Sequence, residues 1–153
     1  FIIHSLLFKK MVIKTIIDIR KPVSVVFKEL VNPKNLPKWV NGFQKLESVK
    51  GRRPRKGSVS KQIIKDSQGI MEIREEILKF EKDKNFEIRL SHKNMETHQH
   101  FAFAKEGKTT RLTLTTTTRR IPAIMAVVSV FMKGQMRRQQ EADLMKLKRL
   151  LED

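Results

Sequence analysis

Residues 19–39 read IRKPVSVVFKELVNPKNLPKW, and this stretch decides how the chain folds. Pro22 is a favourable first residue of a helix, because the N–H that proline lacks would have no partner in the first helical turn. The apolar residues that follow repeat at the spacing of one helical face and predict an amphipathic helix. They are Val23, Val26, Phe27 and Leu30. NPKNLPKW then predicts a turn and one short helix that closes on Trp39, the only tryptophan.

Strands are predicted on both sides of this stretch. Before it, residues 11–19 alternate, which places Ile13, Thr15, Ile17 and Ile19 on one face. After Gly42, segments of strand character are divided by short polar turns. These segments are 43–49, 58–65, 70–80, 86–92, 95–105 and 109–119. Links this short join antiparallel neighbours, because parallel strands need a longer crossover.

A long helix is predicted from Pro122 to the C-terminus. Its second half carries Leu144, Leu147 and Leu151 on one face. Its first half, in IPAIMAVVSVFM, is apolar almost all round. Gly134 lies between the halves and weakens the helix locally by about 1 kcal/mol relative to alanine. A curved sheet wrapped around this helix would bury the apolar faces of all the predicted elements.

This order of elements resembles the START-like SRPBCC superfamily, and its polyketide cyclase/dehydrase-type branch in particular. Three stretches carry the resemblance: residues 19–39, EEILKFEKDKNFEIRL at 75–90 and ADLMKLKRLLED at 142–153. The resemblance implies an α+β helix-grip fold, with a curved antiparallel sheet of about seven strands wrapped around the long C-terminal helix and two short helices after the first strand. It also implies a cavity between sheet and helix.

Residues 11–153 are predicted to form a single domain, with residues 1–10 as an N-terminal extension. In FIIHSLLFKK, Lys9 and Lys10 follow the apolar run, whereas a secretory signal has its cations in front. The run is also shorter than the roughly 20 residues of a membrane-spanning helix. Met11 is a suitable native start, and we expect a cytoplasmic protein.

The composition indicates a folded, basic protein. The 153 residues include 33 Lys and Arg against 16 Asp and Glu, which gives a formal charge of +17. This charge attracts polyanions such as nucleic acid, anionic lipid headgroups or acidic partners, although a spread surplus of lysine also serves solubility. Cysteine is absent from the sequence, which excludes disulfides, thiolate nucleophiles and Cys-ligated zinc. No motif indicates a cofactor.

The alternation of the strands predicts which side chains face the cavity. Phe101 and Phe103 must point inward, so Thr97 and Gln99 share that face. The full set of predicted cavity residues combines such strand positions with apolar residues of the predicted helices: Trp39, Gln62, Ile73, Glu75, Ile77, Thr97, Gln99, Phe101, Phe103, Thr116, Met125 and Val128. An ordinary packed core contains fewer polar groups, which favours a ligand cavity. The alternative is that some of the polar side chains lie near the sheet ends in water.

Glu75 is the sharpest single candidate for catalysis. Either it is an inward carboxylate that serves as a general base or ligand anchor, or it has no such role and is exposed at the strand end or paired with an inward-reaching Arg or Lys. His98 and His100 have a spacing that can chelate a metal. The phase set by Phe101 turns both outward, and the sequence indicates no third ligand, so no metal site is predicted.

The loop GRRPRKG, residues 51–57, gathers four cations between two predicted strands. A loop tip is solvated, so these cations need no partner. Sequence-specific DNA binding would call for a recognition helix or a ribbon with base-reading side chains, and RNA binding for exposed aromatics between the cations; nonspecific electrostatic contact needs neither. Neither accompanies residues 52–56, and nucleic acid is therefore not favoured as a partner.

Three functions are compatible with these features. The first is a carrier or sensor that binds a hydrophobic small molecule or lipid in the cavity. The second is a cyclase- or hydrolase-type enzyme that uses the same cavity with Glu75 as the base. The third is a basic surface that binds an anionic membrane or nucleic acid. The membrane alternative depends on exposed apolar residues of the last helix, unless a loop or a homodimer partner buries them. These residues are Ile124, Val127, Val130 and Phe131.

Overall fold

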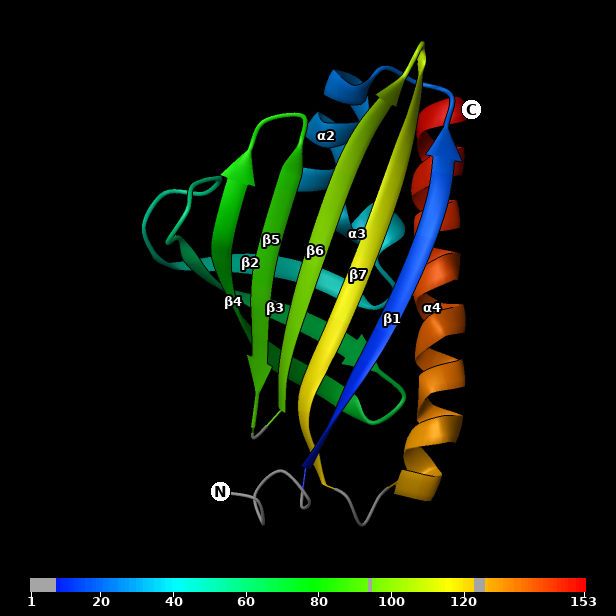
Figure 1. Cartoon of the computed structure of the whole chain (residues 1–153). Helices are drawn as coiled ribbons and strands as arrows, with labels where there is room; N and C mark the ends of the chain where they lie inside the picture. The colour runs from blue at the N-terminus through cyan, green and yellow to red at the C-terminus, as the bar shows by residue number, and fades with distance from the viewer. Residues whose placement is uncertain (1–7, 94, 123–125) are drawn as a thin grey trace.

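The computed structural model describes residues 8–93, 95–122 and 126–153 (Figure 1). In chain order the elements are β1 (Phe8–Ile19), α2 (Val23–Val31), α3 (Leu36–Trp39), β2 (Phe43–Lys50), β3 (Val59–Asp66), β4 (Gly69–Glu81), β5 (Asn85–His92), β6 (Met95–Glu106), β7 (Thr109–Pro122) and α4 (Ala126–Glu152). The predicted order, in which two short helices interrupt a series of strands that a long helix follows, is confirmed.

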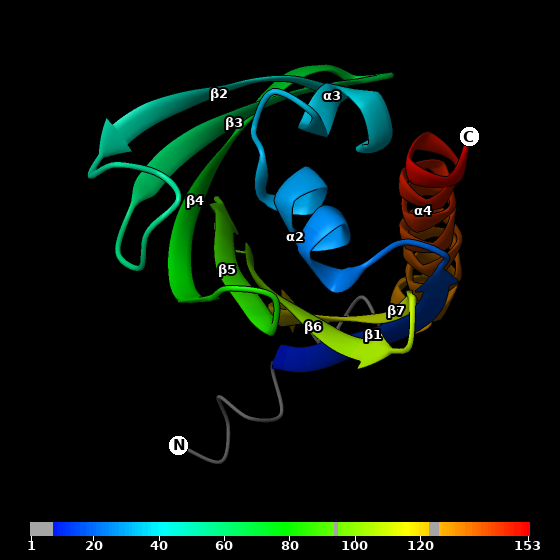
Figure 2. The same ribbon diagram turned by 90° about the horizontal axis from the view of Figure 1, so that it is seen from above.

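The strands form one antiparallel sheet in the order β1-β7-β6-β5-β4-β3-β2. β2 to β7 follow one another as a meander, and β1 then pairs with β7, with Ile13 opposite Thr116. Viewed from above, the sheet curves around α2 and α3, while α4 lies along the open side next to β1 (Figure 2). This is the predicted α+β helix-grip arrangement.

Alternate residues of β7 point to opposite faces of the sheet, as the sequence predicts. Leu112, Leu114 and Thr116 are buried on the concave face, whereas Thr113 and Thr115 between them are partly exposed on the convex face. The period of two arises because successive side chains of a strand leave the backbone in opposite directions. The concave face is therefore fixed by the sequence along this strand.

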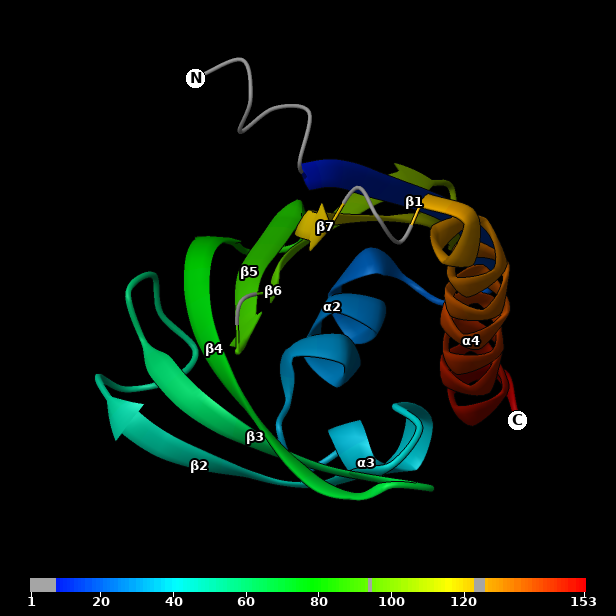
Figure 3. The same cartoon turned by 90° about the horizontal axis from the view of Figure 1, so that it is seen from below.

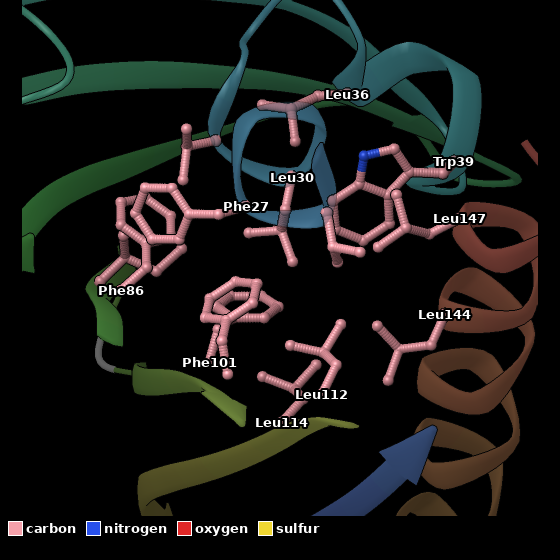
Figure 4. Close-up of a cluster of buried hydrophobic side chains, with 14 of the residues drawn as sticks. Phe27, Leu30, Leu36, Trp39, Phe86, Phe101, Leu112, Leu114, Leu144 and Leu147 are labelled. Atoms are coloured by element: carbon pink, nitrogen blue, oxygen red, sulfur yellow. The ribbon is translucent and has the colours of Figure 1, made fainter. Parts of the chain in front are cut away.

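The two short helices fill one end of the curved sheet with a packed core (Figure 4). Phe27 of α2 packs edge-on against Phe80 and Phe103, with ring centroids 5.3 and 5.0 Å away. Such edge-to-face pairs are favourable arrangements of aromatic rings. Ile77, only 1% exposed, belongs to the same core. The core thus fills the space beside α2. It does not fill the whole concave face of the sheet.

Helix α4 packs against β1 along its length. Near its N-terminal end, Met132 and Met136 contact Met11 and Ile13 of β1. No described helix, α4 included, is long and apolar enough to cross a membrane.

The C-terminal end of α4 is anchored by Glu152. Its carboxylate accepts hydrogen bonds from the backbone N–H of Arg20 at 2.8 Å and from Lys148 Nζ at 2.7 Å. Lys148 also donates to the backbone carbonyl of Asp18 at 2.6 Å. These donors, the Arg20 N–H above all, lower the pKa of Glu152 to about 2. The last turn of α4 is therefore tied to the end of β1.

The Glu152→Gln variant is expected to be less stable than wild type near neutral pH. Because the pKa of Glu152 falls from 4.5 to about 2 on folding, its stabilisation is complete above pH 4.5 and is lost as the pH falls toward 2. Thermal unfolding followed by circular dichroism at a series of pH values measures the difference. The two melting temperatures should converge toward pH 2, and a difference that stays constant with pH would contradict the assigned role.

Candidate ligand-binding pocket

A cavity of about 330 Å³ lies between the concave face of the sheet, α3 and α4. Its volume falls at the small end of the roughly 300–1,000 Å³ found for ligand sites. The wall is mostly apolar and includes Ile13, Leu30, Leu36, Trp39, Phe43, Phe86, Ile88, Leu90, Phe101, Leu114, Met136 and Leu144. The polar lining residues are Arg53, Gln62, Glu75, Thr97, Gln99, Thr116, Gln139, Gln140 and Asp143. An apolar wall with a few polar groups is typical of a small-molecule site.

The structure places most of the predicted cavity residues in this lining. Those that line it are Trp39, Gln62, Glu75, Thr97, Gln99, Phe101 and Thr116. Phe103 and Ile77 do not line the cavity, because both are packed in the core beside Phe27. Ile73 also lies outside the lining; it is only partly buried and sits nearer the β3–β4 turn than Glu75. Met125 and the side chain of Val128 lie outside the described residues.

At one side of the cavity, Glu75 pairs with Arg53. The side chains of Glu75 and Arg53 are 2% and 8% exposed, and Arg53 Nη1 donates to Glu75 Oε1. Gln62 Nε2 donates to the other carboxylate oxygen at 2.6 Å. The guanidinium also lies over the ring of Phe86, 5.7 Å from its centroid. Of the two predicted roles for Glu75, the structure shows the pairing with an inward-reaching arginine.

Arg53 comes from the loop GRRPRKG, which the sequence predicted to be solvated. That prediction is wrong for Arg53, because its side chain is buried and neutralises the buried carboxylate of Glu75. Gly57 N–H donates to the carbonyl of Ile77 at 2.8 Å, and Ile77 N–H donates to the carbonyl of Ser58 at 3.0 Å, which holds the loop against the strand. Three other cations of the loop are exposed, as predicted: Arg52, Arg55 and Lys56.

Two hydrogen-bond donors of the cavity wall are buried without a partner among the described residues. They are Arg53 Nε and Trp39 Nε1. Figure 4 shows the indole nitrogen of Trp39 on the edge of the ring that faces Leu30 and Leu36, within the apolar cluster. Buried donors in native proteins are nearly always paired, and an unpaired one calls for an explanation. A ligand with an acceptor oxygen would supply the partner.

Gln140 connects α4 to the sheet at the wall of the cavity. Its Oε1 accepts from Thr116 Oγ1 at 2.5 Å, and its Nε2 donates to Thr15 Oγ1 at 2.9 Å. Thr116, which the sequence predicted as a cavity residue, therefore also helps to hold the helix. Gln140 itself was not predicted, although it precedes Leu144 and Leu147 at the spacing of the buried helical face.

Where α3 approaches α4, a second carboxylate borders the cavity. Asp143 Oδ1 accepts from Gln139 Nε2 at 2.8 Å and from the backbone N–H of Asn41 at 3.3 Å. Asn41 Nδ2 also donates to Gln139 Oε1 at 3.4 Å. Burial raises the pKa of Asp143 above its ordinary value of 3.8, because desolvation outweighs these hydrogen bonds. Asp143 was not predicted, because apolar residues alone defined the predicted buried face of the last helix.

The Asp143→Asn variant is expected to be more stable than wild type near neutral pH. The pKa of Asp143 is higher in the folded state than in the unfolded state, so ionising the carboxyl group costs stability above the folded pKa. Asparagine keeps an acceptor for Gln139 and Asn41 without the charge. Denaturant unfolding at several pH values checks this, because the advantage should disappear once the pH falls below 3.8. A variant less stable than wild type at neutral pH would show that the charge is favourable.

The two histidines with chelating spacing lie on β6 and face away from the cavity. His98 Nε2 lies 3.0 Å from Glu87 Oε1, and His100 Nε2 lies 2.7 Å from Asn85 Oδ1, both across the β5–β6 pair. The described residues contain no group of three or more side chains suited to hold a metal ion. The polar chemistry of the concave face is thus that of arginine, amide, hydroxyl and carboxylate groups.

Residues 11–152 match the family described as "Polyketide cyclase / dehydrase and lipid transport". No sequence among curated proteins matches the chain. Several solved structures share the fold at low identity. TTHA0849 from Thermus thermophilus is 18% identical with a TM-score of 0.74, and the alignment covers 91% of this chain and 95% of that chain. A conserved protein from Geobacillus kaustophilus is 14% identical with a TM-score of 0.75, and the alignment covers 92% of this chain and 95% of that chain.

A further structural neighbour comes from a biosynthetic pathway. It is StfQ, a di-domain ARO/CYC protein from the steffimycin pathway, 12% identical with a TM-score of 0.73. The alignment covers 97% of this chain and 52% of that chain. At such identities the likeness extends to the fold alone.

Proposed function

Because the chain belongs to the polyketide cyclase/dehydrase and lipid transport family, we propose that it is a carrier or sensor that binds a hydrophobic small molecule or lipid in the cavity between sheet and α4. The observation that supports this most directly is the cavity itself. Its wall is mostly apolar, and it also contains two buried hydrogen-bond donors without partners among the described residues. Apolar contacts would supply most of the affinity, and the donors would fix the orientation of the ligand.

The polar end of the ligand is expected to be an uncharged acceptor such as a carbonyl or hydroxyl oxygen. Arg53 already shares its charge with Glu75, so the pair as a whole is neutral. A ligand carboxylate would compete with Glu75 for the same guanidinium and would lose its hydration. A carbonyl oxygen can accept from Arg53 Nε or Trp39 Nε1 at a much smaller desolvation cost.

The Trp39→Phe variant is expected to bind an apolar ketone about tenfold more weakly than wild type, because one hydrogen bond contributes roughly 1–1.5 kcal/mol. The matched hydrocarbon lacks the oxygen and cannot accept a hydrogen bond from the indole. Its affinity should therefore fall less, because for this ligand the substitution changes only apolar contacts. Thermal-shift or calorimetric titration of both ligands measures the difference. An equal loss for ketone and hydrocarbon would show that the indole N–H does not contact the ligand.

A cyclase-type enzyme in the same cavity is the second candidate, and one observation bears on which residue would act. Each oxygen of Glu75 already accepts a hydrogen bond, one from Arg53 and the other from Gln62. The raised pKa and position of Asp143 make that carboxyl group the better acid or base. Conversion of Glu75 or Asp143 to its amide would reduce turnover by orders of magnitude in an enzyme, with binding retained. In a carrier it would change affinity modestly.

A further inference from the structure

One end of the molecule exposes large apolar side chains from three separate elements. Val130 and Phe131, in the first turns of α4, are 77% and 66% exposed. Ile70 at the start of β4 is 72% exposed, and Met95 at the start of β6 is 38% exposed. In Figure 1 the starts of α4 and β6 lie at the same end of the molecule, and the β3–β4 turn lies toward that end on the α4 side; Figure 3, which looks onto this end, shows the three at separate places around it. We call these four residues the apolar end.

The apolar end is surrounded by positive charge. Lys133, Arg137 and Arg138 follow Phe131 on α4, and the sequence from residue 107 to residue 140 contains no Asp or Glu. Lys93 is exposed in the β5–β6 turn. Three acidic groups lie on nearby strand ends, Asp66, Glu72 and Glu96; Glu72 lies 3.6 Å from Lys61, and Glu96 is paired with Arg89 at 2.8 Å. Cations thus outnumber acids around the exposed apolar residues.

We propose that the apolar end docks on the surface of an anionic bilayer. A bilayer offers both a negative headgroup layer and an apolar interior, and an adjacent apolar and basic surface uses both. A nucleic acid offers phosphates but no apolar layer for Val130 and Phe131. The sequence predicted that Ile124 and Val127 also belong to this surface. Ile124 and the side chain of Val127 lie outside the described residues.

The docked surface would lie beside the cavity without being part of it. Met136, on the helix after Phe131, both lines the cavity and packs on β1. Docking therefore brings the cavity wall close to the bilayer. The proposal does not depend on what the cavity binds, since the apolar end lines none of it.

The proposal is tested by cosedimentation of the full chain with vesicles. Vesicles of phosphatidylcholine alone are compared with vesicles of phosphatidylcholine and phosphatidylglycerol in equal amounts. Binding is expected only to the anionic vesicles and should weaken as salt shortens the range of the charge interaction. If the protein stays in the supernatant with anionic vesicles at low salt, the proposal is wrong.

Two pairs of variants identify the surface. Val130→Gln with Phe131→Gln is expected to weaken binding by about tenfold or more, because two inserted apolar side chains are lost. The matched control, Ile16→Thr with Val49→Thr, removes two exposed apolar side chains elsewhere and should bind like wild type. Likewise Lys133→Gln with Arg137→Gln should weaken binding more than Lys146→Gln with Arg149→Gln. Circular dichroism confirms that each variant is folded.

Two further outcomes would overturn the proposal by assigning the surface to another partner. Self-association that is abolished by Val130→Gln with Phe131→Gln, without vesicle binding, would assign it to a second copy of the chain. Binding to duplex DNA in place of anionic vesicles, unaffected by the same pair of substitutions, would assign the basic surface to nucleic acid. Equal vesicle binding by the test pair and its control would also contradict docking through the apolar end.

Discussion

Replacing Arg53 with methionine is expected to destabilise the fold by about 3–5 kcal/mol, the cost of leaving a buried charge without its partner. The side chain of Glu75 is 2% exposed, and in the variant only the amide of Gln62 would remain to stabilise its charge. Methionine is similar to the arginine stem in length and apolar character, so the loss reports on the guanidinium, which pairs with Glu75 and lies over Phe86. Urea unfolding at neutral pH, extrapolated to water, measures the change.

Two further variants make the interpretation specific. Arg55→Met alters an exposed cation of the same loop and should change the free energy of unfolding by less than about 0.5 kcal/mol. Adding Glu75→Gln to Arg53→Met removes the isolated charge and should restore most of the lost stability. If Arg53→Met is as stable as Arg55→Met, or if the double variant is no better than the single one, Arg53 does not serve as the buried partner of Glu75.

Filling the cavity is expected to have the largest effect on binding. The Gln99→Trp variant places an indole into a space of about 330 Å³ and should weaken the binding of any apolar ligand by about 100-fold or more, equivalent to roughly 2.7 kcal/mol. Gln99→Ala is the matched control, because it removes the same amide while enlarging the cavity. Calorimetric titration with a ligand of the wild-type protein measures both.

The control and the filled variant must behave differently for the cavity to be the binding site. Gln99→Ala should bind within a few-fold of wild type, and circular dichroism should show both variants folded. Equal binding by Gln99→Trp and wild type would place the ligand elsewhere on the protein. Equal loss in both variants would show that the amide of Gln99, and not the available space, controls binding.

The sequence predicted the concave face of the sheet well because strand geometry leaves little freedom. Once Phe101 and Leu114 are assigned to the interior, the period of two fixes Thr97, Gln99 and Thr116 on the same face. The period of two does not indicate how far α2 extends along the concave face of the sheet. Phe103 and Ile77 therefore appeared to be cavity residues, although α2 packs against the part of the sheet they occupy.

Arg53 could not be predicted because its neighbours look the same in the sequence. GRRPRKG contains four cations within one loop. The local sequence does not indicate which of the four side chains is buried in the folded protein. The signal that existed was indirect: an inward Glu75 needs a partner, and the loop directly precedes the strand that pairs with β4. Choosing Arg53 required the position of the loop beside β4, where hydrogen bonds of Gly57 and Ser58 with Ile77 continue the β3–β4 pairing.

Asp143 and Gln140 were missed for a different reason. The spacing of the apolar residues alone identifies Leu144 and Leu147 as the buried face of α4. It does not include the polar residues on the same side of the helix. A long helix beside a cavity can bury polar groups that find partners, as Gln140 does with Thr15 and Thr116. Polar residues at the phase of a buried helical face are therefore candidates for the cavity wall as much as the apolar ones.

We claim that the cavity between sheet and α4 holds an apolar ligand, and native mass spectrometry of the purified protein would detect that ligand. We expect wild type and Gln99→Ala to carry a non-covalent small molecule that denaturation in organic solvent releases, and Gln99→Trp to carry none. Thermal stabilisation by apolar compounds should follow the same order. A wild-type protein without any bound molecule, and without thermal stabilisation by fatty acids, polycyclic ketones or polycyclic phenols, would contradict the claim.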